Sequence, residues 1–303
     1  MPLRDNFAAR GRVGRNAKVT RACAGGIHGL AEGVGASRHM KLMLLAIWQY
    51  RHFILTSIRN DLRTRFARSR LGAIWMILQP LAQGAIYALV LARVLGSKLP
   101  GTTNRYAYVI YLLAGLAAWS LFAEVITRCL TIFVDNASLL KKMMFPRICL
   151  PLIVSGSCLL NNLFLLLATI GIFIVIGNEP GWMWLWLPVL IGITLVFALA
   201  LGLILGVLNV FVRDVAQVMT VVMQLWFWLT PIVYVVNILP GTFATVLRLN
   251  PMYAITSSYQ QVLLWGNPPH VKSLSVIFLA SVVMLGLAMG LFRRASPDMV
   301  DVL

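Results

Sequence analysis

Side chains that commonly carry chemistry are few in this sequence, and their spacing does not bring them together. The four cysteines form no CxxC pair, the four histidines form no HExxH pair, and no GxxxxGK[ST] phosphate-binding loop is present. We therefore expect no metal and no cofactor on this chain, and no phosphate-binding loop of its own.

Ionisable residues within the long apolar stretches are equally scarce, although such residues mark functional sites in membrane proteins. Glu124 and Arg128 stand four residues apart near the end of one stretch, where one helical turn would pair them. We interpret the two as a structural pair, with a gating role as the alternative. No carboxylate pair and no Ser/His set falls within a stretch, which predicts that the chain is not an enzyme.

The segment that follows the second stretch has a composition suited to docking. A short helix there would be capped by Asp135 or Asn136 and stopped by Pro146. Its apolar side would carry Leu139, Leu140, Met143 and Met144, and its basic side Lys141 and Lys142. A short amphipathic helix with adaptable methionines suits a groove on a soluble partner. The alternative, a basic loop that only fixes topology, would not need the apolar side.

Residues 239–272 combine prolines and glycines with apolar stretches that are too short to cross a membrane. Such interrupted segments are typical of re-entrant half-helices, which are tolerated at membrane depth when they are buried in protein or line a water-filled path. The pattern favours a translocation path with an outer gate. A plain extracellular loop is the alternative.

Aromatic residues in and near the apolar stretches are candidates for lining such a path. Sugars pack their C–H faces on aromatic rings, so a ringed path would suit a glycan. The candidates are Trp119, Trp226, Trp228 and Tyr234. Lipid-facing or core packing is the alternative, and it is the default explanation for the same residues.

The elements that position these residues are long apolar helices. Of 303 residues, 60% are hydrophobic and 12% charged, whereas a soluble domain is about half apolar and a quarter charged. Six stretches are long enough to cross a membrane, namely 72–95, 106–126, 148–176, 183–208, 215–238 and 273–292. The sequence therefore predicts an all-α polytopic membrane protein with six transmembrane helices.

The residues before the first stretch divide in two. Residues 1–39 are rich in Arg, Gly and Ala and are predicted to be a disordered basic extension, with Met40 as the natural start. Residues 40–71 alternate apolar and basic groups and predict an amphipathic helix on the cytoplasmic surface. Residues 72–294 would then form the transmembrane domain and 295–303 a cytoplasmic tail.

The placement of positive charge predicts the orientation. With the N-terminus inside, 21 of the 26 Lys and Arg residues fall on the inner side and five on the outer side. Both termini are then cytoplasmic. Because the basic residues flank apolar stretches, we expect anionic membrane lipid, and not nucleic acid, to explain the net charge of +17.

Several motifs also stand in a specific order. They are Asp61-Leu-Arg-Thr-Arg-Phe-Ala-Arg-Ser69, Leu71-Gly72 with Trp75 and Pro80, Leu139-Leu-Lys-Lys-Met-Met-Phe-Pro-Arg147, Arg213-Asp214, Leu229-Thr-Pro-Ile-Val-Tyr234 and Asn250-Pro251. Together they resemble the ABC-2 type permeases of the polysaccharide, O-antigen and capsule (polyol phosphate) export family. The resemblance covers about Met40 to Arg294.

The resemblance implies a half-transporter without catalytic residues. Two copies would form the path, and two copies of a separate ATPase subunit would hydrolyse ATP. The coupling helix to that subunit would consist of Leu139, Leu140, Lys141, Lys142, Met143, Met144, Phe145, Pro146 and Arg147. The cytoplasmic entrance would include Asp61, Arg63, Arg65 and Trp75, and the outer gate Asn250, Pro251 and Tyr253. The cargo would be a glycan on a lipid carrier, exported across the bacterial inner membrane.

Two alternatives stay open. A drug or small-lipid exporter would keep the architecture and change the cargo. A membrane-embedded glycosyltransferase or acyltransferase would need a convergent set of carboxylates or histidines, which the sequence does not offer.

Overall fold

The computed structural model describes residues 51–67, 74, 78, 82, 85–86, 106–137, 149–175, 177–178, 180–236, 240–296 and 298–299. The chain divides into two compact units, Met1–His52 and Phe53–Leu303. Apart from Arg51 and His52, the residues described below belong to the second unit. The expected extension 1–39, most of the expected span 72–95 and the expected coupling helix Leu139–Arg147 lie outside the described residues.

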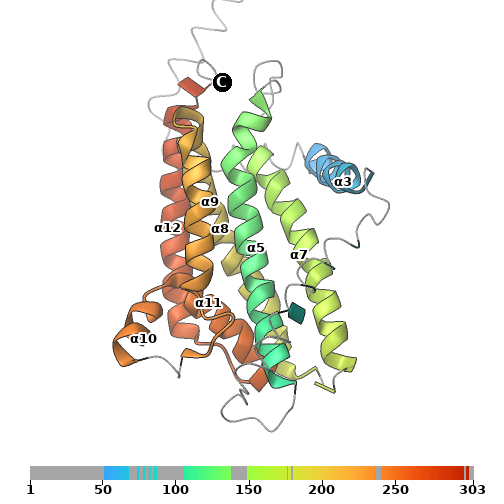
Figure 1. Cartoon of the computed structure of the whole chain (residues 1–303). Helices are drawn as coiled ribbons and strands as arrows, with labels where there is room; N and C mark the ends of the chain where they lie inside the picture. The colour runs from blue at the N-terminus through green and yellow to red at the C-terminus, as the bar shows by residue number, and fades with distance from the viewer. Residues whose placement is uncertain are drawn as a thin grey trace, which may run out of the picture. The chain divides into compact units, whose positions relative to one another are not determined.

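Every regular element within the described ranges is a helix (Figure 1). In chain order these are α3 (Arg51–Ala67), α5 (Ala107–Asp135), α7 (Cys149–Val175), the 3-10 turn η1 (Trp182–Trp186), α8 (Leu187–Phe211), α9 (Asp214–Trp228), α10 (Gly241–Arg248), α11 (Pro251–Gln260), the π-helical turn η3 (Gln261–Trp265) and α12 (Val271–Ala295).

Four of these helices are long and apolar enough to cross a membrane: α5, α7, η1 with α8, and α12. They have 29, 27, 30 and 25 residues, and a hydrocarbon core of about 30 Å takes about 20. The prediction of an all-helical protein with several membrane-crossing helices is confirmed for the described part of the chain. The fifth expected span corresponds to α9, which has only 15 helical residues.

Helix α5 runs nine residues further than predicted, to Asp135 instead of Ile126. Its end is closed by Asn136, whose side-chain amide donates to the Ile132 carbonyl at 2.8 Å. Asn136 is thus the C-cap of α5, and the helix that Asp135 or Asn136 was expected to cap lies beyond Ala137, outside the described residues.

Helix α9 ends ten residues earlier than predicted, at Trp228 instead of Ile238. Pro231 has no amide hydrogen to donate, and its ring disfavours the helical conformation of Thr230 before it. Residues 229–236 consequently form a succession of turns.

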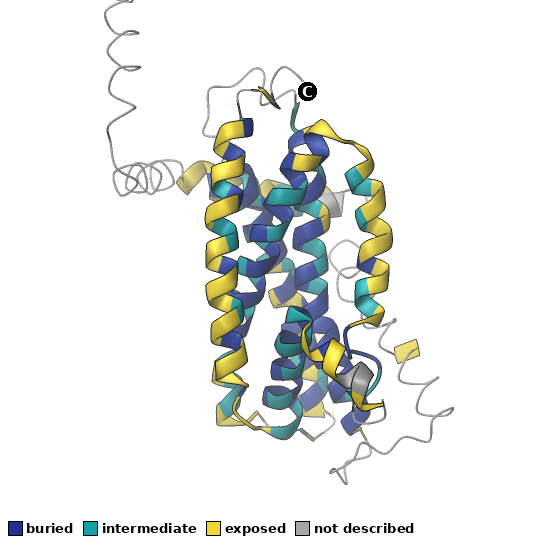
Figure 2. Ribbon diagram, turned by 90° about the vertical axis from the view of Figure 1, so that its left-hand side faces the viewer, coloured by how far each residue is buried: buried dark blue, intermediate teal, exposed yellow. Residues whose placement is uncertain are grey.

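Helix α5 is the centre of the bundle, with 20 of its 29 residues buried. It contacts α7, α8, α9 and α11, and Figure 2 shows exposed residues mainly on the outward faces of the surrounding helices. Helix α8 comes close through Gly202 and Gly206. A Cβ at Gly202 would lie 2.8 Å from Cβ of Cys129, and one at Gly206 would collide with the Cys129 carbonyl. Small residues four apart allow this approach of two helices.

The chain between α9 and α12 contains two short helices, α10 and α11, at one end of the bundle (Figure 1). We call this end the α11 end. Helix α11 has only ten residues, yet six of them are buried, because it packs against α5, α8 and α12. Helix α11 is thus a packed part of the bundle, whereas most of the described side chains of α10 are exposed.

Candidate functional site

The Asn250-Pro251 pair, expected at an outer gate, lies where α9 and α11 meet. Asn250 is the N-cap of α11, and Pro251 is the first helical residue. The Asn250 side chain makes four hydrogen bonds: it accepts from the Trp226 indole (2.9 Å) and the Met252 amide (3.0 Å), and it donates to the Leu229 carbonyl (3.2 Å) and the Thr230 hydroxyl (3.1 Å). One amide therefore joins the end of α9 to the start of α11.

The turns after α9 are held by side chains from two other helices. Tyr108 donates to the Val233 carbonyl at 2.7 Å. The Tyr111 hydroxyl lies 3.0 Å from the carbonyl oxygens of both Pro231 and Tyr234, which share its one hydrogen, and the Gln260 amide donates to the Pro231 carbonyl at 3.1 Å. Because the turns cannot satisfy their own carbonyls, α5 and α11 supply the donors. The irregular segment is therefore tied to both neighbours.

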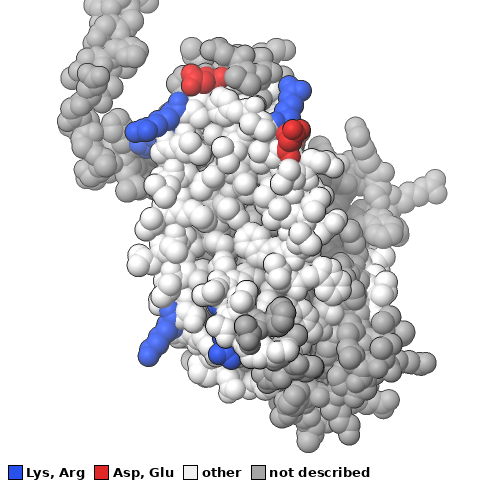
Figure 3. All heavy atoms as spheres, turned by 60° about the vertical axis from the view of Figure 1, so that its left-hand side comes forward, with Lys and Arg blue, Asp and Glu red and all other residues white. Residues whose placement is uncertain are grey.

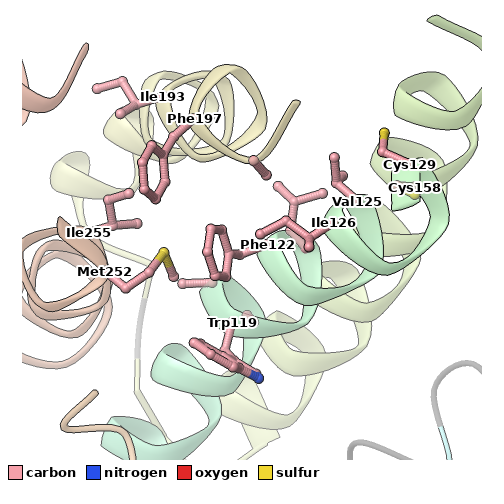
Figure 4. Close-up of a cluster of buried hydrophobic side chains, with 14 of the residues drawn as sticks. Trp119, Phe122, Val125, Ile126, Cys129, Cys158, Ile193, Phe197, Met252 and Ile255 are labelled. Atoms are coloured by element: carbon pink, nitrogen blue, oxygen red, sulfur yellow. The ribbon is translucent and has the colours of Figure 1, made fainter. Parts of the chain in front are cut away.

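The candidate path aromatics divide into packed and exposed groups. Trp119 is 9% exposed and lies 5.4 Å from the Phe122 ring and 5.5 Å from the Phe227 ring. Figure 4 shows Phe122 in a buried cluster with residues of α8 and α11, and the Trp226 ring stands 5.1 Å from it. For Trp119 this environment favours the alternative of core packing.

The other two candidates lie nearer the surface. Trp228 is 57% exposed at the end of α9. Tyr234 is half-buried, and its hydroxyl donates to the Trp228 carbonyl at 2.8 Å. The structure thus brings Trp226, Trp228 and Tyr234 to the junction that Asn250 organises.

Of the residues expected at the cytoplasmic entrance, Asp61 has a defined partner. Its carboxylate accepts from the Arg128 guanidinium at 2.7 Å, with both side chains partly buried. Arg63 is exposed on the same helix. The side chain of Arg65 and all of Trp75 lie outside the described residues.

The expected pair of Glu124 with Arg128 was wrong. Arg128 contacts Asp61 and, at 3.6 Å, the Cys158 sulfur, whereas Glu124 accepts from the Asn161 amide at 2.6 Å. Both charged groups turn away from their own helix because α3 and α7 offer partners that are 67 and 37 residues distant in sequence. The two interactions join α5 to each of these neighbours.

Helix α9 presents a polar face that the sequence reading missed. Only Met223 is buried in this helix, and Gln217, Thr220 and Gln224 are exposed. These three residues follow a helical spacing of three and four, so one side of the helix is polar within an apolar stretch. The spacing of these three polar residues in the sequence could have predicted the polar face.

Charged side chains avoid the middle of one face of the described surface (Figure 3). Figure 3 shows them at two ends of one face, with a broad uncharged band between. At the α11 end, Lys and Arg appear without Asp or Glu among the described residues. This distribution is typical of a surface whose middle faces hydrocarbon.

Comparison with known proteins gives a consistent result along most of the chain. The profile of the ABC-2 type transporter family matches residues 52–264. An O-antigen export system permease protein of Myxococcus xanthus is 29% identical over 257 residues, which are 84% of this chain and 96% of that protein. A protein of the same description from Klebsiella pneumoniae is 27% identical, covering 82% and 95%. The polysialic acid transport protein of Escherichia coli is 21% identical, covering 80% and 92%.

Proposed function

The chain belongs to the ABC-2 type transporter family, and from that premise we propose that it is the permease subunit of an ABC exporter for a lipid-linked surface polysaccharide. The observation that carries the proposal is the likeness, along 92–96% of their lengths, to proteins described as permeases or transporters of O-antigen and polysialic acid. Both cargoes are surface polysaccharides. The membrane would be the bacterial inner membrane.

The proposed topology has six spans with both termini in the cytoplasm. Helices α5, α7, α8 and α12 supply four spans, residues 72–95 supply the first, and α9 with the turns after it supplies the fifth. The excess of Lys and Arg on the inner side supports this orientation. The α11 end then faces outward, and α10, α11 and η3 form the re-entrant part of the transmembrane domain 72–294. Residues 295–303 form the cytoplasmic tail.

Residues 40–71 would lie along the cytoplasmic surface of the membrane. In the described part of this segment, Ile54 and Ile58 are buried on one side of α3, and Arg59 is exposed. Ile58 sits close to α7, since a Cβ added at Gly156 would collide with it. The exposed apolar residues Phe53 and Leu55, beside the exposed Arg59 and Arg63, suit an interface with anionic lipid.

The path would form between two copies of the chain, along the polar face of α9. Gln217 and Gln224 are poorly suited to hydrocarbon, because an amide without a hydrogen-bond partner is costly there. A hydrated passage for sugar hydroxyls would provide such partners. The junction at Asn250 would close the outer end of this passage, with Pro251 and Tyr253 beside it.

ATP would be hydrolysed by a separate subunit that docks on Leu139–Arg147. The sequence has no phosphate-binding loop of its own. Closure of two ATPase subunits would push on this coupling helix, provided that their open and closed states contact it differently. The movement would reach the outer gate through α5, which directly precedes Leu139–Arg147 in the chain. At the other end of α5, Tyr108 and Tyr111 hold the turns after α9.

The test is export in a strain that lacks this chain. The deletion strain should accumulate the glycan inside the cell and lose it from the surface, and the native chain should restore it. The Leu140→Asp/Met143→Asp variant should insert in the membrane but fail to restore export or to co-purify with an ATPase subunit, because two carboxylates oppose an apolar contact.

The matched control is Leu140→Ile/Met143→Leu, which keeps the apolar surface and should restore export. Full export by the Asp variant would contradict the docking assignment. A deletion strain with normal surface glycan and altered drug sensitivity would contradict the cargo.

A further inference from the structure

A cavity of about 730 Å³ opens at the α11 end, between α10–α11 and the start of α12. Binding pockets for small molecules commonly measure about 300–1,000 Å³. The polar groups of its lining are those of Arg248, Asn250, Tyr253, Ser257, His270, Lys272 and Ser273. They come from three segments that the fold brings together.

The described lining of the cavity carries two positive charges and no acidic group. Arg248 ends α10 and Lys272 begins α12, and neither forms an ion pair within the described residues. The sequence contains no Asp or Glu between Asp214 and Asp298. Two cations that line one cavity without a carboxylate favour an anion as the ligand.

Neutral donors extend this lining. The hydroxyls of Tyr253 and Ser273 have no hydrogen bond to another described residue, so both are available to a ligand. The Asn250 side chain is occupied by its four bonds and forms a fixed wall. His270 is likewise held, at 2.9 Å from Gln261.

Part of the lining of the same cavity is apolar. Val276 and Ile277 stand one turn beyond Lys272 on α12 and belong to it, and Val276 is 68% exposed. A ligand with an anionic head and a hydrocarbon chain could therefore place its head between Arg248 and Lys272 and its chain along α12.

We infer that this cavity binds the phosphate ester of a lipid, with Arg248 and Lys272 as its cationic partners. Arginine suits phosphate because its planar guanidinium can donate two parallel hydrogen bonds, and lysine adds a compact charge. The phosphate could belong to a phospholipid headgroup or to the isoprenoid carrier of a glycan. Only the second source rests on the proposed function, because the cavity itself does not depend on export.

The experiment measures binding to the full chain purified in dodecyl maltoside, a detergent without phosphate. Native mass spectrometry follows titration with polyprenyl phosphate and with phosphatidylglycerol, and calorimetry follows inorganic phosphate. We expect both lipids to bind, and the Arg248→Ala/Lys272→Ala variant to bind them at least about ten-fold more weakly. The Arg248→Lys/Lys272→Arg variant should keep most of the affinity, which shows that the altered chain is folded.

The matched control is Arg213→Ala/Arg294→Ala, which removes two positive charges from the opposite end of the bundle. It should leave the affinity within about two-fold, since screening limits the reach of charge to about 10 Å at 0.1 M salt. If polyprenyl phosphate binds more tightly than phosphatidylglycerol, the carrier is the source of the phosphate. If the two lipids bind equally, the source is a phospholipid. If inorganic phosphate binds as tightly as the lipids, the ligand is a free ion.

Unchanged binding in the Arg248→Ala/Lys272→Ala variant would overturn the inference, as would an equal loss in the control variant. Export is measured separately, so a chain that binds lipid phosphate but exports no glycan would contradict the proposed function and leave the phosphate site in place.

Discussion

Replacing Asn250 by alanine should separate the end of α9 from the start of α11. The change removes four hydrogen bonds of 2.9–3.2 Å, and a typical hydrogen bond contributes about 0.5–1.5 kcal/mol net. The loss of the helix cap is included in this set. We therefore expect the free energy of unfolding to fall by about 2–6 kcal/mol.

Asn250→Asp separates the two hydrogen bonds that Asn250 accepts from the two that it donates. A carboxylate still accepts from the Trp226 indole and the Met252 amide, but it cannot donate to the Leu229 carbonyl or the Thr230 hydroxyl. The loss in unfolding free energy should be about 1–3 kcal/mol, with electrostatic repulsion between the carboxylate and the Leu229 carbonyl as part of it.

Two measurements on the purified chain in detergent test this reasoning. Denaturant titration followed by circular dichroism gives the unfolding free energy, and hydrogen exchange reports the amides of α11 directly. Asn250→Ala should accelerate exchange in α11, because its first turn loses its cap.

The matched control is Asn136→Ala, at the far end of α5. That asparagine donates one side-chain hydrogen bond, to the Ile132 carbonyl, so its loss should cost about 1 kcal/mol and leave exchange in α11 unchanged. The reasoning is refuted if both Asn250 variants unfold within about 0.5 kcal/mol of the native chain and α11 exchanges at its native rate.

Two further predictions concern the helix contacts of α5. A double-mutant cycle with Asp61→Asn and Arg128→Gln should give a coupling free energy of about 1–3 kcal/mol, because the pair is short and partly buried; a value near zero in the same titration would contradict the contact. Gly206→Ala should lower the unfolding free energy by about 1–3 kcal/mol, since its new Cβ collides with the Cys129 carbonyl. Gly192→Ala on the same helix meets open space and should be neutral or slightly stabilising, so equal losses at the two glycines would contradict the close approach of α8 to α5.

Long apolar helices could be predicted from the sequence because their signal is local. In a membrane, a run of about 20 apolar residues must form its backbone hydrogen bonds within itself. A helix does so by pairing each amide with a carbonyl four residues away. The interrupted composition of residues 239–272 was equally readable, and the structure forms the short helices α10 and α11 there. The signal for the early end of α9 was also local, because Pro231 stands three residues after Trp228, although the predicted span ran past it.

The partner of Arg128 could not be predicted in the same way. Local spacing favoured Glu124, four residues away, but the isolated-helix preference of such a pair is only about 0.2–0.5 kcal/mol. The ion pair with Asp61 of α3, 67 residues earlier, forms once the helices pack, and its free energy exceeds that small preference. Sequence distance carries no information about such a contact.

The sequence by itself determined that the chain is a helical membrane protein with one end of its bundle richer in positive charge, because length, hydropathy and charge act residue by residue. Tertiary structure alone decided which groups share a site. Asn250 joins α9 to α11, and Arg248 and Lys272, 24 residues apart, line one cavity, since both arrangements depend on how α9 to α12 fold back on one another around α5. The Asn250 junction and the cavity lined by Arg248 and Lys272 are therefore properties of packing, which no single stretch of the sequence contains.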